Sequence, residues 1–233
     1  MNSGYANPYT VASAAPSERA LFIRKTYLHL AFAILAFIGI EAFLLSQPWA
    51  HQLAGKMVGG MGWLIVLGAF MGVSFLAERL AASEASRGKQ YLGLGIFIVA
   101  EAIIFLPILI LAKFYANDPQ VILKAGITTG CVFGGLTFAA FATGKDFSFL
   151  RGFLMVGGFV ALGIIVTSII FGFNLGTIFS GAMAIFASVA ILYNTSNIIH
   201  HYRTDQYVSA SLSLFASVAL LFWYILQIFM SRD

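Results

Sequence analysis

Charged residues are scarce in this sequence. Only 9% of its 233 residues are Asp, Glu, Lys or Arg, whereas 60% are hydrophobic. A soluble domain has about 25% charged residues, so a water-soluble fold of this composition would lack the polar side chains that its surface needs. With a mean hydropathy of +0.92, the chain is expected to be a membrane protein without a second, soluble domain.

Cysteine and the common catalytic motifs are also almost absent. Cys131 stands alone, which excludes an internal disulfide, and its apolar surroundings favour a small packing residue. There is no HExxH, GxSxG or P-loop motif. Intramembrane catalysis needs paired acids or a nucleophile with a base, and the middle of the expected spans holds one acid. The sequence therefore predicts no enzyme, no cofactor and no metal site.

Long apolar runs make up most of the chain. Seven segments are about 20 residues long, the length at which a helix crosses a bilayer. They do not alternate as spanning strands do, and helices satisfy their own backbone hydrogen bonds in lipid. No small-residue cleavage site ends the first run, so it is expected to be a span rather than a signal peptide. The segments are Tyr27–Ser46, Met61–Leu80, Tyr91–Ala112, Val121–Ala142, Gly152–Gly172, Thr177–Asn197 and Tyr207–Met230.

The sequence thus predicts an all-α integral membrane protein with two parts. Residues 1–26 are expected to be a mobile cytoplasmic tail, and residues 27–233 a single seven-helix domain. The 13 Lys and Arg residues are scattered between the apolar segments, which fits membrane topology and does not suggest a nucleic-acid partner.

The distribution of Lys and Arg predicts the orientation. Cytoplasmic loops carry an excess of these residues, and nine of them lie on the N-terminal side of the expected membrane against four on the other. The N-terminus is therefore expected in the cytoplasm and the C-terminus outside. The nine are Arg19, Arg24, Lys25, Arg79, Arg87, Lys89, Lys145, Arg151 and Arg203; the four are Lys56, Lys113, Lys124 and Arg232.

Glu101 is the strongest single candidate for a functional residue. It lies about ten residues into the third segment, near the expected midplane, where a carboxylate is costly and by default functional. Pro107 follows and can kink the helix. Either the pair forms a polar spot for a cation or proton, or Glu101 is protonated and bonded to a neighbouring helix. Glu41 is expected to reach the outer interface, and Glu78 and Arg79 the cytoplasmic interface.

The polar stretch YNTSNIIHHYRTDQ, residues 193–206, interrupts the apolar pattern. Asn194 and Asn197 share a helix face, and serines recur every four residues along the next segment. These two stripes could hydrogen-bond two antiparallel helices or form the wall of a polar pathway. His200 and His201 could sense pH, but adjacent residues at a helix end point apart and are not expected to share a metal. The serines are Ser209, Ser213 and Ser217.

Glycines recur every four residues in two segments. Such stripes allow helix backbones to approach closely, so close helix packing is the favoured interpretation and a flexible gate the alternative. The glycines are Gly68 and Gly72 in the second segment, and Gly126, Gly130 and Gly134 in the fourth.

Four stretches give the chain a family resemblance. It resembles the Bax-inhibitor-motif family, and most closely its bacterial YccA-like branch. The resemblance implies seven helices with the seventh in the centre of the other six. The stretches are AEAIIFLP (100–107), GKDFSFLRGFL (144–154), ILYNTSNIIHHYRTDQY (191–207) and SLSLFASVALLFWYILQIF (211–229).

The resemblance also implies site residues. Calcium-leak members of the family have two facing aspartates on the last two helices, and Asn194 and Ser217 stand at the matching positions. Arg79 approximately matches an arginine that pairs with those aspartates, and Glu101 matches the family's third-helix acid. An acid-controlled calcium leak is therefore not favoured, because neither amide nor hydroxyl titrates near neutral pH.

Two further features come from the family pattern. Asp146 and Ser148 match a cytoplasmic loop motif and are expected to cap the following helix. Family members suppress cell death in eukaryotes and leak Ca²⁺, while a bacterial branch restrains the membrane-bound AAA protease FtsH.

The favoured function is modulation of membrane-protein quality control and stress response in the bacterial inner membrane. The alternative is a pH-sensitive leak of Ca²⁺ or another cation, with Glu101 as the conducting or sensing acid. The expected partners are the lipid bilayer and a membrane-bound AAA protease complex, with Ca²⁺ or protons in the alternative.

Overall fold

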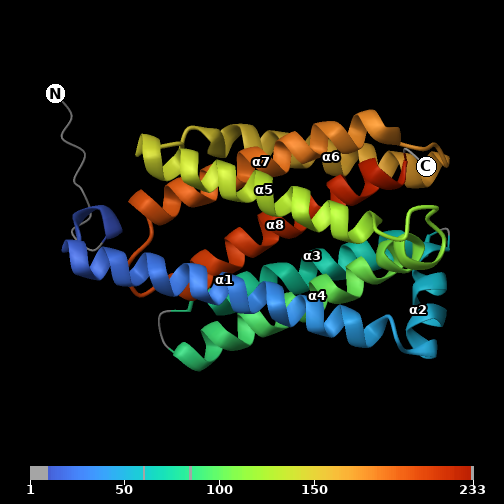
Figure 1. Ribbon diagram of the computed structural model, residues 1–233, viewed down its shortest axis with the longest axis horizontal. Coiled ribbons are helices and arrows are strands. Elements are labelled where there is room, and N and C mark those ends of the chain that lie inside the picture. The colour runs from blue at the N-terminus through green and yellow to red at the C-terminus, as the bar shows by residue number, and fades with distance from the viewer. Residues whose placement is uncertain (1–9, 60, 84–85, 232–233) are drawn as a thin grey trace.

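Eight α-helices and no strand make up the part of the chain that a computed structural model describes, namely residues 10–59, 61–83 and 86–231 (Figure 1). A short 3₁₀ helix, Val11–Ser13, precedes them. The α-helices are α1 (Pro16–Leu44), α2 (Pro48–Val58), α3 (Gly62–Ala81), α4 (Arg87–Phe114), α5 (Val121–Thr143), α6 (Leu150–Phe171), α7 (Gly176–His200) and α8 (Tyr207–Met230).

Seven of these helices confirm the seven membrane-spanning segments that the sequence predicts. All except α2 are long and apolar enough to cross a membrane. They run along the long axis of the molecule, and the start of α1 and the end of α8 lie at opposite ends of the bundle (Figure 1). We call these the N-terminal end and the C-terminal end of the bundle. The protein is therefore an all-α integral membrane protein.

The first helix begins earlier than the sequence predicts. Pro16 opens α1 well before Tyr27, and proline suits a first helical turn because its missing N–H would have no helical acceptor there. Val11 is fully buried, and its backbone N–H donates to the Tyr202 carbonyl at 2.9 Å. Residues 10–26 of the expected tail are thus packed or helical, while residues 1–9 lie outside the described residues and their mobility stays a prediction.

The short helix α2 was not predicted, since its 11 residues are too few to span. It lies across the long helices at the C-terminal end of the bundle (Figure 1). Ala50 and Ala54 are buried, while Trp49 is 51% exposed on another face. An apolar face packed on the bundle explains why this loop folds as an amphipathic helix.

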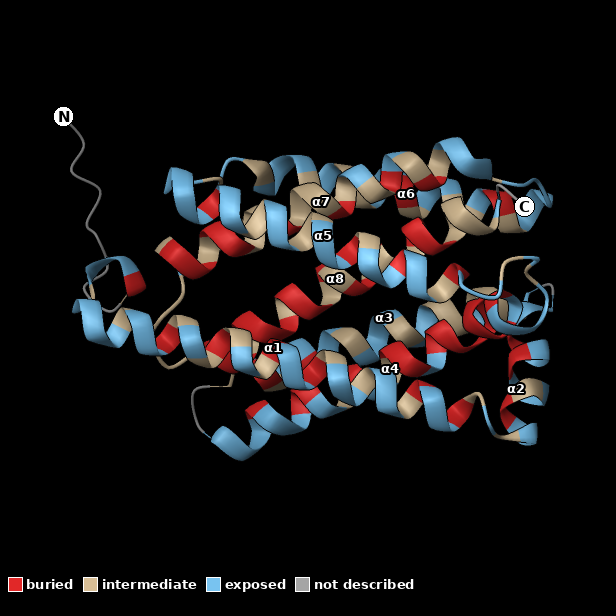
Figure 2. Ribbon diagram, in the orientation of Figure 1, coloured by how far each residue is buried: buried red, intermediate tan, exposed pale blue. Residues whose placement is uncertain are grey.

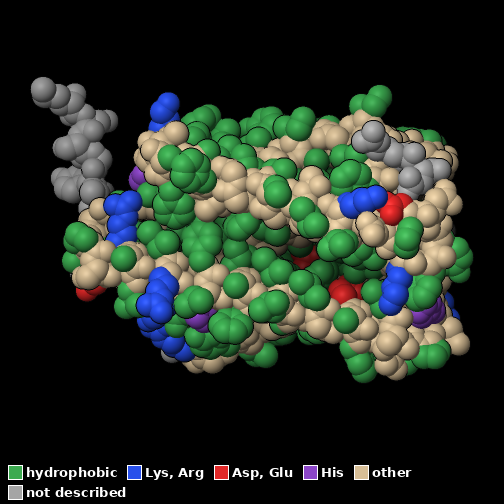
Figure 3. All heavy atoms as spheres, viewed as in Figure 1, with side chains coloured by type: hydrophobic (Ala, Val, Ile, Leu, Met, Phe, Trp, Pro, Cys, Tyr) green, Lys and Arg blue, Asp and Glu red, His purple; other side chains and the backbone are tan. Residues whose placement is uncertain are grey.

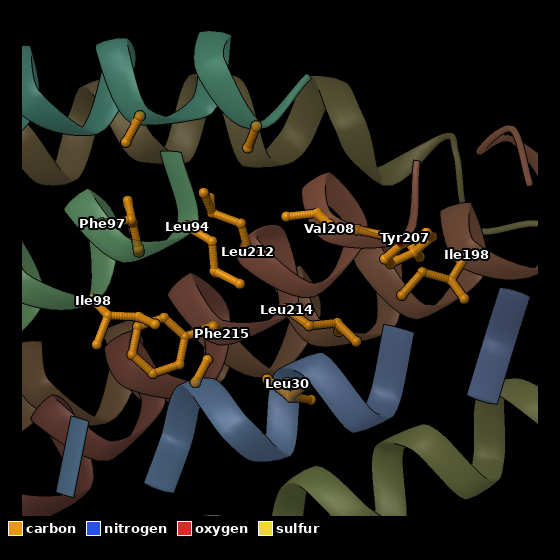
Figure 4. Packing of buried hydrophobic residues seen from close by; sticks show 14 of the residues in the cluster. Leu30, Leu94, Phe97, Ile98, Ile198, Tyr207, Val208, Leu212, Leu214 and Phe215 are labelled. Carbon is orange, nitrogen blue, oxygen red and sulfur yellow. The ribbon is translucent and has the colours of Figure 1, made fainter. Parts of the chain in front are cut away.

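The core is built around α8 and α4, as the buried residues in Figure 2 show. α8 packs against α7, α1, α5, α4 and α3, and Ala161 of α6 shares a small buried cluster with Tyr224 of α8. Figure 4 shows Phe215 of α8 between Leu30 of α1 and Ile98 of α4. The large apolar side chains that remain exposed, such as Ile178, suit contact with lipid.

The predicted glycine packing is wrong for contacts within this chain. A Cβ built on any of the five stripe glycines would meet nothing within 4 Å, because the stripes face outward. The close approach occurs at Gly93 instead. A Cβ there would lie 2.5 Å from the Ala77 carbonyl oxygen and 2.6 Å from the Ala81 nitrogen. Gly93 therefore allows α4 to pack tightly on α3.

Candidate functional site

Asn194 of α7 and Ser217 of α8 are in direct contact. The Asn194 Nδ2 donates to Ser217 Oγ at 2.8 Å and to the Ser213 carbonyl at 3.2 Å. Ser217 is buried, and its Oγ also lies 3.0 Å from the same Ser213 carbonyl. The two polar stripes of the sequence thus face each other, as expected for interhelical hydrogen bonds in a membrane. The contact contains no charge.

A pair of hydroxyl groups continues from this contact toward the N-terminal end of the bundle. Tyr202 OH and Ser213 Oγ lie 3.1 Å apart. Sequence reasoning did not single out Tyr202. The same tyrosine accepts the backbone bond from Val11, so a short chain of contacts links the N-terminal segment to the polar pair.

Asn197 has a different role from Asn194. Its backbone carbonyl accepts from the His201 and Tyr202 N–H groups, at 2.8 and 3.0 Å. Those bonds satisfy a carbonyl that the helix would otherwise leave free at the end of α7. Asn197 therefore marks where the helix ends, and its side chain is not part of the Asn194–Ser217 contact.

Arg79 does not join the polar pair in the described part of the chain. Its guanidinium lies over the Phe75 ring, 4.3 Å from the ring centroid. This is a cation–π contact one turn back along α3. The family resemblance approximately matched Arg79 to a third member of the site, and the structure places no bond between it and Asn194 or Ser217.

Glu101 is buried in the middle of α4, with 6% of the residue exposed. Its carboxylate has no hydrogen-bond partner among the described residues, so the alternative of a bond to a neighbouring helix is not seen. Instead it lines a cavity of about 1080 Å³. α4 continues through Pro107 without interruption. In Figure 3 red acidic atoms show in a hollow of the green apolar face, and other acidic side chains lie at the surface toward the two ends of the bundle.

The cavity runs along most of the bundle. Helices α3 and α4 form one side of the cavity and α6 and α7 form the other, with α8 between them. Most of the lining is apolar or aromatic. Ser74 and Glu78 stand toward the N-terminal end, while Ser180 and Gln227, 2.9 Å apart, stand toward the other. Glu101 is the acid between these polar ends.

Glu41 is buried rather than interfacial, so its expected position was wrong. It is 4% exposed, and within the described residues neither carboxylate oxygen has a hydrogen-bond partner. The cause is its helix face, since Leu44 lies three residues on and packs with Ala102 and Leu106 of α4. The spacing of Glu41 from Phe37 and Leu44 is the signal that could have revealed this. It does not line the cavity.

Asp146 ties a loop to the end of α7. Its Oδ1 accepts the Ser148 N–H at 2.9 Å and its Oδ2 lies 2.9 Å from His201 Nε2, while Ser196 Oγ accepts the Phe147 N–H at 2.8 Å. Partial burial opposes ionisation, yet the Ser148 and His201 bonds outweigh it and hold the pKa of Asp146 at about 2.

The capping role predicted for Asp146 and Ser148 is therefore wrong. α6 begins at Leu150 with Phe149 in the cap position and no side-chain cap bond. The Asp146 carboxylate is used by the loop itself and by His201. The ring of His200 bonds instead to the Ser196 carbonyl, at 3.0 Å. No group of three or more metal-binding side chains gathers in the described ranges.

These observations define a seven-span helical membrane protein with a neutral interhelical contact and a cavity lined by Glu101. The family model described as "Inhibitor of apoptosis-promoting Bax1" matches residues 19–233. The chain belongs to this Bax inhibitor family.

Bacterial proteins are among its relatives. An uncharacterised protein of Pseudomonas aeruginosa is 33% identical over 198 residues, covering 82% of each chain. One of Pasteurella multocida is 32% identical, covering 76% of this chain and 75% of its own. A membrane protein of Vibrio cholerae is 36% identical over 91 residues, covering 37% of this chain and 41% of its own.

Proposed function

We propose that this protein modulates membrane-protein quality control under stress by associating with a membrane-bound AAA protease of the FtsH type. It would act in the bacterial inner membrane with its N-terminus in the cytoplasm. The observation that carries the proposal is the uncharged Asn194–Ser217 contact. It stands where calcium-leak members of the family have their acid pair, and it offers neither a titrating group nor charge for Ca²⁺. A protein that works by contact fits this site better than an acid-gated leak.

The packing of the N-terminal segment supports the same proposal. Val11 bonds to Tyr202, and Tyr202 meets Ser213 beside the neutral contact. A partner that grips the chain before Val11 would therefore pull on the junction of α7 and α8. This provides a physical route from a cytoplasmic protease to the bundle.

The test compares the full chain with a variant that lacks residues 2–9, both expressed in bacterial inner membranes. The full chain should copurify with the protease in mild detergent and lengthen the half-life of a membrane substrate. Without residues 2–9 both effects should fall, while removal of residues 232–233 at the other end should change neither. If the full chain neither copurifies with the protease nor alters substrate half-life, the proposal fails.

The second candidate is a pH-sensitive leak of Ca²⁺ or another cation, which the cavity lined by Glu78 and Glu101 favours. Flux would be measured in proteoliposomes at neutral and mildly acidic pH. Glu101→Gln should abolish flux, and Glu41→Gln, which removes a buried acid outside the cavity, should preserve it. Flux no higher than in empty vesicles at either pH would remove this candidate.

A further inference from the structure

We propose that the cavity around Glu101 binds a long-chain organic ammonium compound. The charged nitrogen would meet the Glu101 carboxylate, and the alkyl chain would lie along the aromatic wall. This inference depends on neither the protease association nor ion flux.

The buried carboxylate is the first reason. Glu101 faces the cavity, is 94% buried and has no hydrogen-bond partner among the described residues. A carboxylate removed from water without a partner is costly, and a buried charge is stabilised when a hydrogen-bonding counter-charge reaches it. An ammonium group with N–H donors supplies both the charge and the bonds.

The surrounding chemistry favours an ammonium over a metal ion. A hard divalent cation takes about six to eight oxygen ligands. The other acid in the cavity lining is Glu78, near the end of α3. Its neighbours Ala77 and Ala81 meet Gly93 of α4, which lies about 12 Å along that helix from Glu101. The remaining polar groups gather toward the two ends. One carboxylate in an apolar wall matches one monovalent organic cation.

Aromatic rings stand next to the acid on the same helix. Phe97 and Phe105 lie one helical turn before and after Glu101, and both line the cavity. Phe97 packs against Phe70 of α3 at 6.3 Å, and Phe105 against Trp223 of α8 at 4.9 Å, measured between ring centroids. Aromatic rings beside a carboxylate favour an organic cation, because a ring can attract a cation over its face.

The size of the cavity fits a molecule with a long apolar chain. Its volume of about 1080 Å³ slightly exceeds the roughly 300–1,000 Å³ typical of small-molecule pockets. Along α3 the lining extends from Trp63 to Glu78, which is about 22 Å at 1.5 Å per residue. Glu101 lies partway along, so a head group placed there leaves apolar wall for the chain.

Tryptophan fluorescence gives a direct assay. Of the three tryptophans, Trp63 and Trp223 line the cavity, while Trp49 is on α2 outside it. The purified full chain with Trp49→Phe would be placed in phosphatidylcholine nanodiscs, which have no net surface charge. The probes are brominated dodecylamine and brominated dodecanol, which quench tryptophan and share the same tail.

The amine should quench saturably, with an apparent Kd about tenfold or more below that of the alcohol, as one hydrogen-bonded charge pair implies. Glu101→Gln should bring the ratio of the two Kd values close to one and leave alcohol binding unchanged. Glu101→Asp should keep a preference for the amine, which protects the test if the glutamine variant does not fold. Glu41→Gln, a buried acid outside the cavity, should keep the full ratio.

Two results would overturn the inference. One is a ratio near one in the chain that retains Glu101, which would mean that the cavity takes any alkyl chain. The other is an amine preference that survives in folded Glu101→Gln. Circular dichroism and size-exclusion profiles of each variant establish folding. A failure of protease association or of ion flux would leave these quenching ratios unaffected.

Discussion

The Asn194–Ser217 contact can be tested by a double-mutant cycle. Asn194→Ala removes two interhelical hydrogen bonds, at 2.8 and 3.2 Å, whereas Ser217→Ala removes the first of these. Interhelical hydrogen bonds in membranes average about 0.6 kcal/mol, with a maximum of about 1.7. We therefore expect a loss of unfolding free energy of about 1.2 kcal/mol for Asn194→Ala and about 0.6 kcal/mol for Ser217→Ala.

The double variant should lose about 1.2 kcal/mol rather than the sum of about 1.8, because the shared bond is counted once. The coupling energy is then about 0.6 kcal/mol. The assay is SDS-induced unfolding of the purified chain in mixed micelles, followed by circular dichroism. The three variants and the parent chain are measured together.

Ser188 provides the control, since its Oγ bonds to the Ala184 carbonyl of its own helix at 2.8 Å. Asn194→Ala and Ser188→Ala should add without coupling. A coupling below about 0.3 kcal/mol between Asn194 and Ser217 would lie within ordinary additivity. That result would refute the idea that this pair holds α7 and α8 together.

Three further predictions follow from the packing and the loops. Gly93→Ala should lower the thermal unfolding temperature and reduce the free energy of unfolding by about 1–3 kcal/mol, because the added Cβ would overlap α3. Gly130→Ala, on the exposed face of α5, should be neutral or slightly stabilising. A similar loss at both would show that the close approach is absent. Asp146, with its pKa lowered to about 2, should stabilise the fold above pH 4 and lose this contribution as the pH falls toward 2. Because 43% of its side chain is exposed, this contribution to the free energy of unfolding should be under about 1 kcal/mol. Asp146→Asn should flatten this part of a profile of unfolding against pH. An unchanged profile would count against the loop bond. Val11→Asp should release the N-terminal segment and speed tryptic cleavage at Arg19, and unaltered cleavage would show that burial of Val11 does not hold it.

The positions of the helices could be predicted from the sequence more readily than the contacts between them. The spans could be predicted because about 20 apolar residues in a row have one solution in lipid, a helix that satisfies its own backbone. The facing stripes of Asn194 and Ser217 could also be predicted, since a short loop makes α7 and α8 antiparallel neighbours. The sequence did not predict α2, because a helix of 11 residues is too short to be found by looking for membrane spans.

The error over the glycine contacts has a physical cause. In a soluble helix, apolar residues mark the inward face, but in a spanning helix both the lipid face and the packed face are apolar. Sequence therefore could not tell that Gly130 faces outward while Gly93 meets α3. The capping prediction failed because Asp146 had a competing partner, His201, 55 residues away in the chain.

The amino-acid sequence by itself determined that the chain spans a membrane seven times, roughly which segments form the spans, and that Glu101 sits in the middle of one. Composition and run length suffice for this, because the cost of exposing polar backbone to lipid acts on each helix separately. The tertiary structure alone decided contacts that no sequence pattern marks. It opened a cavity beside Glu101 and packed Gly93 of α4 against α3, since these outcomes depend on how side chains from different helices fill shared space.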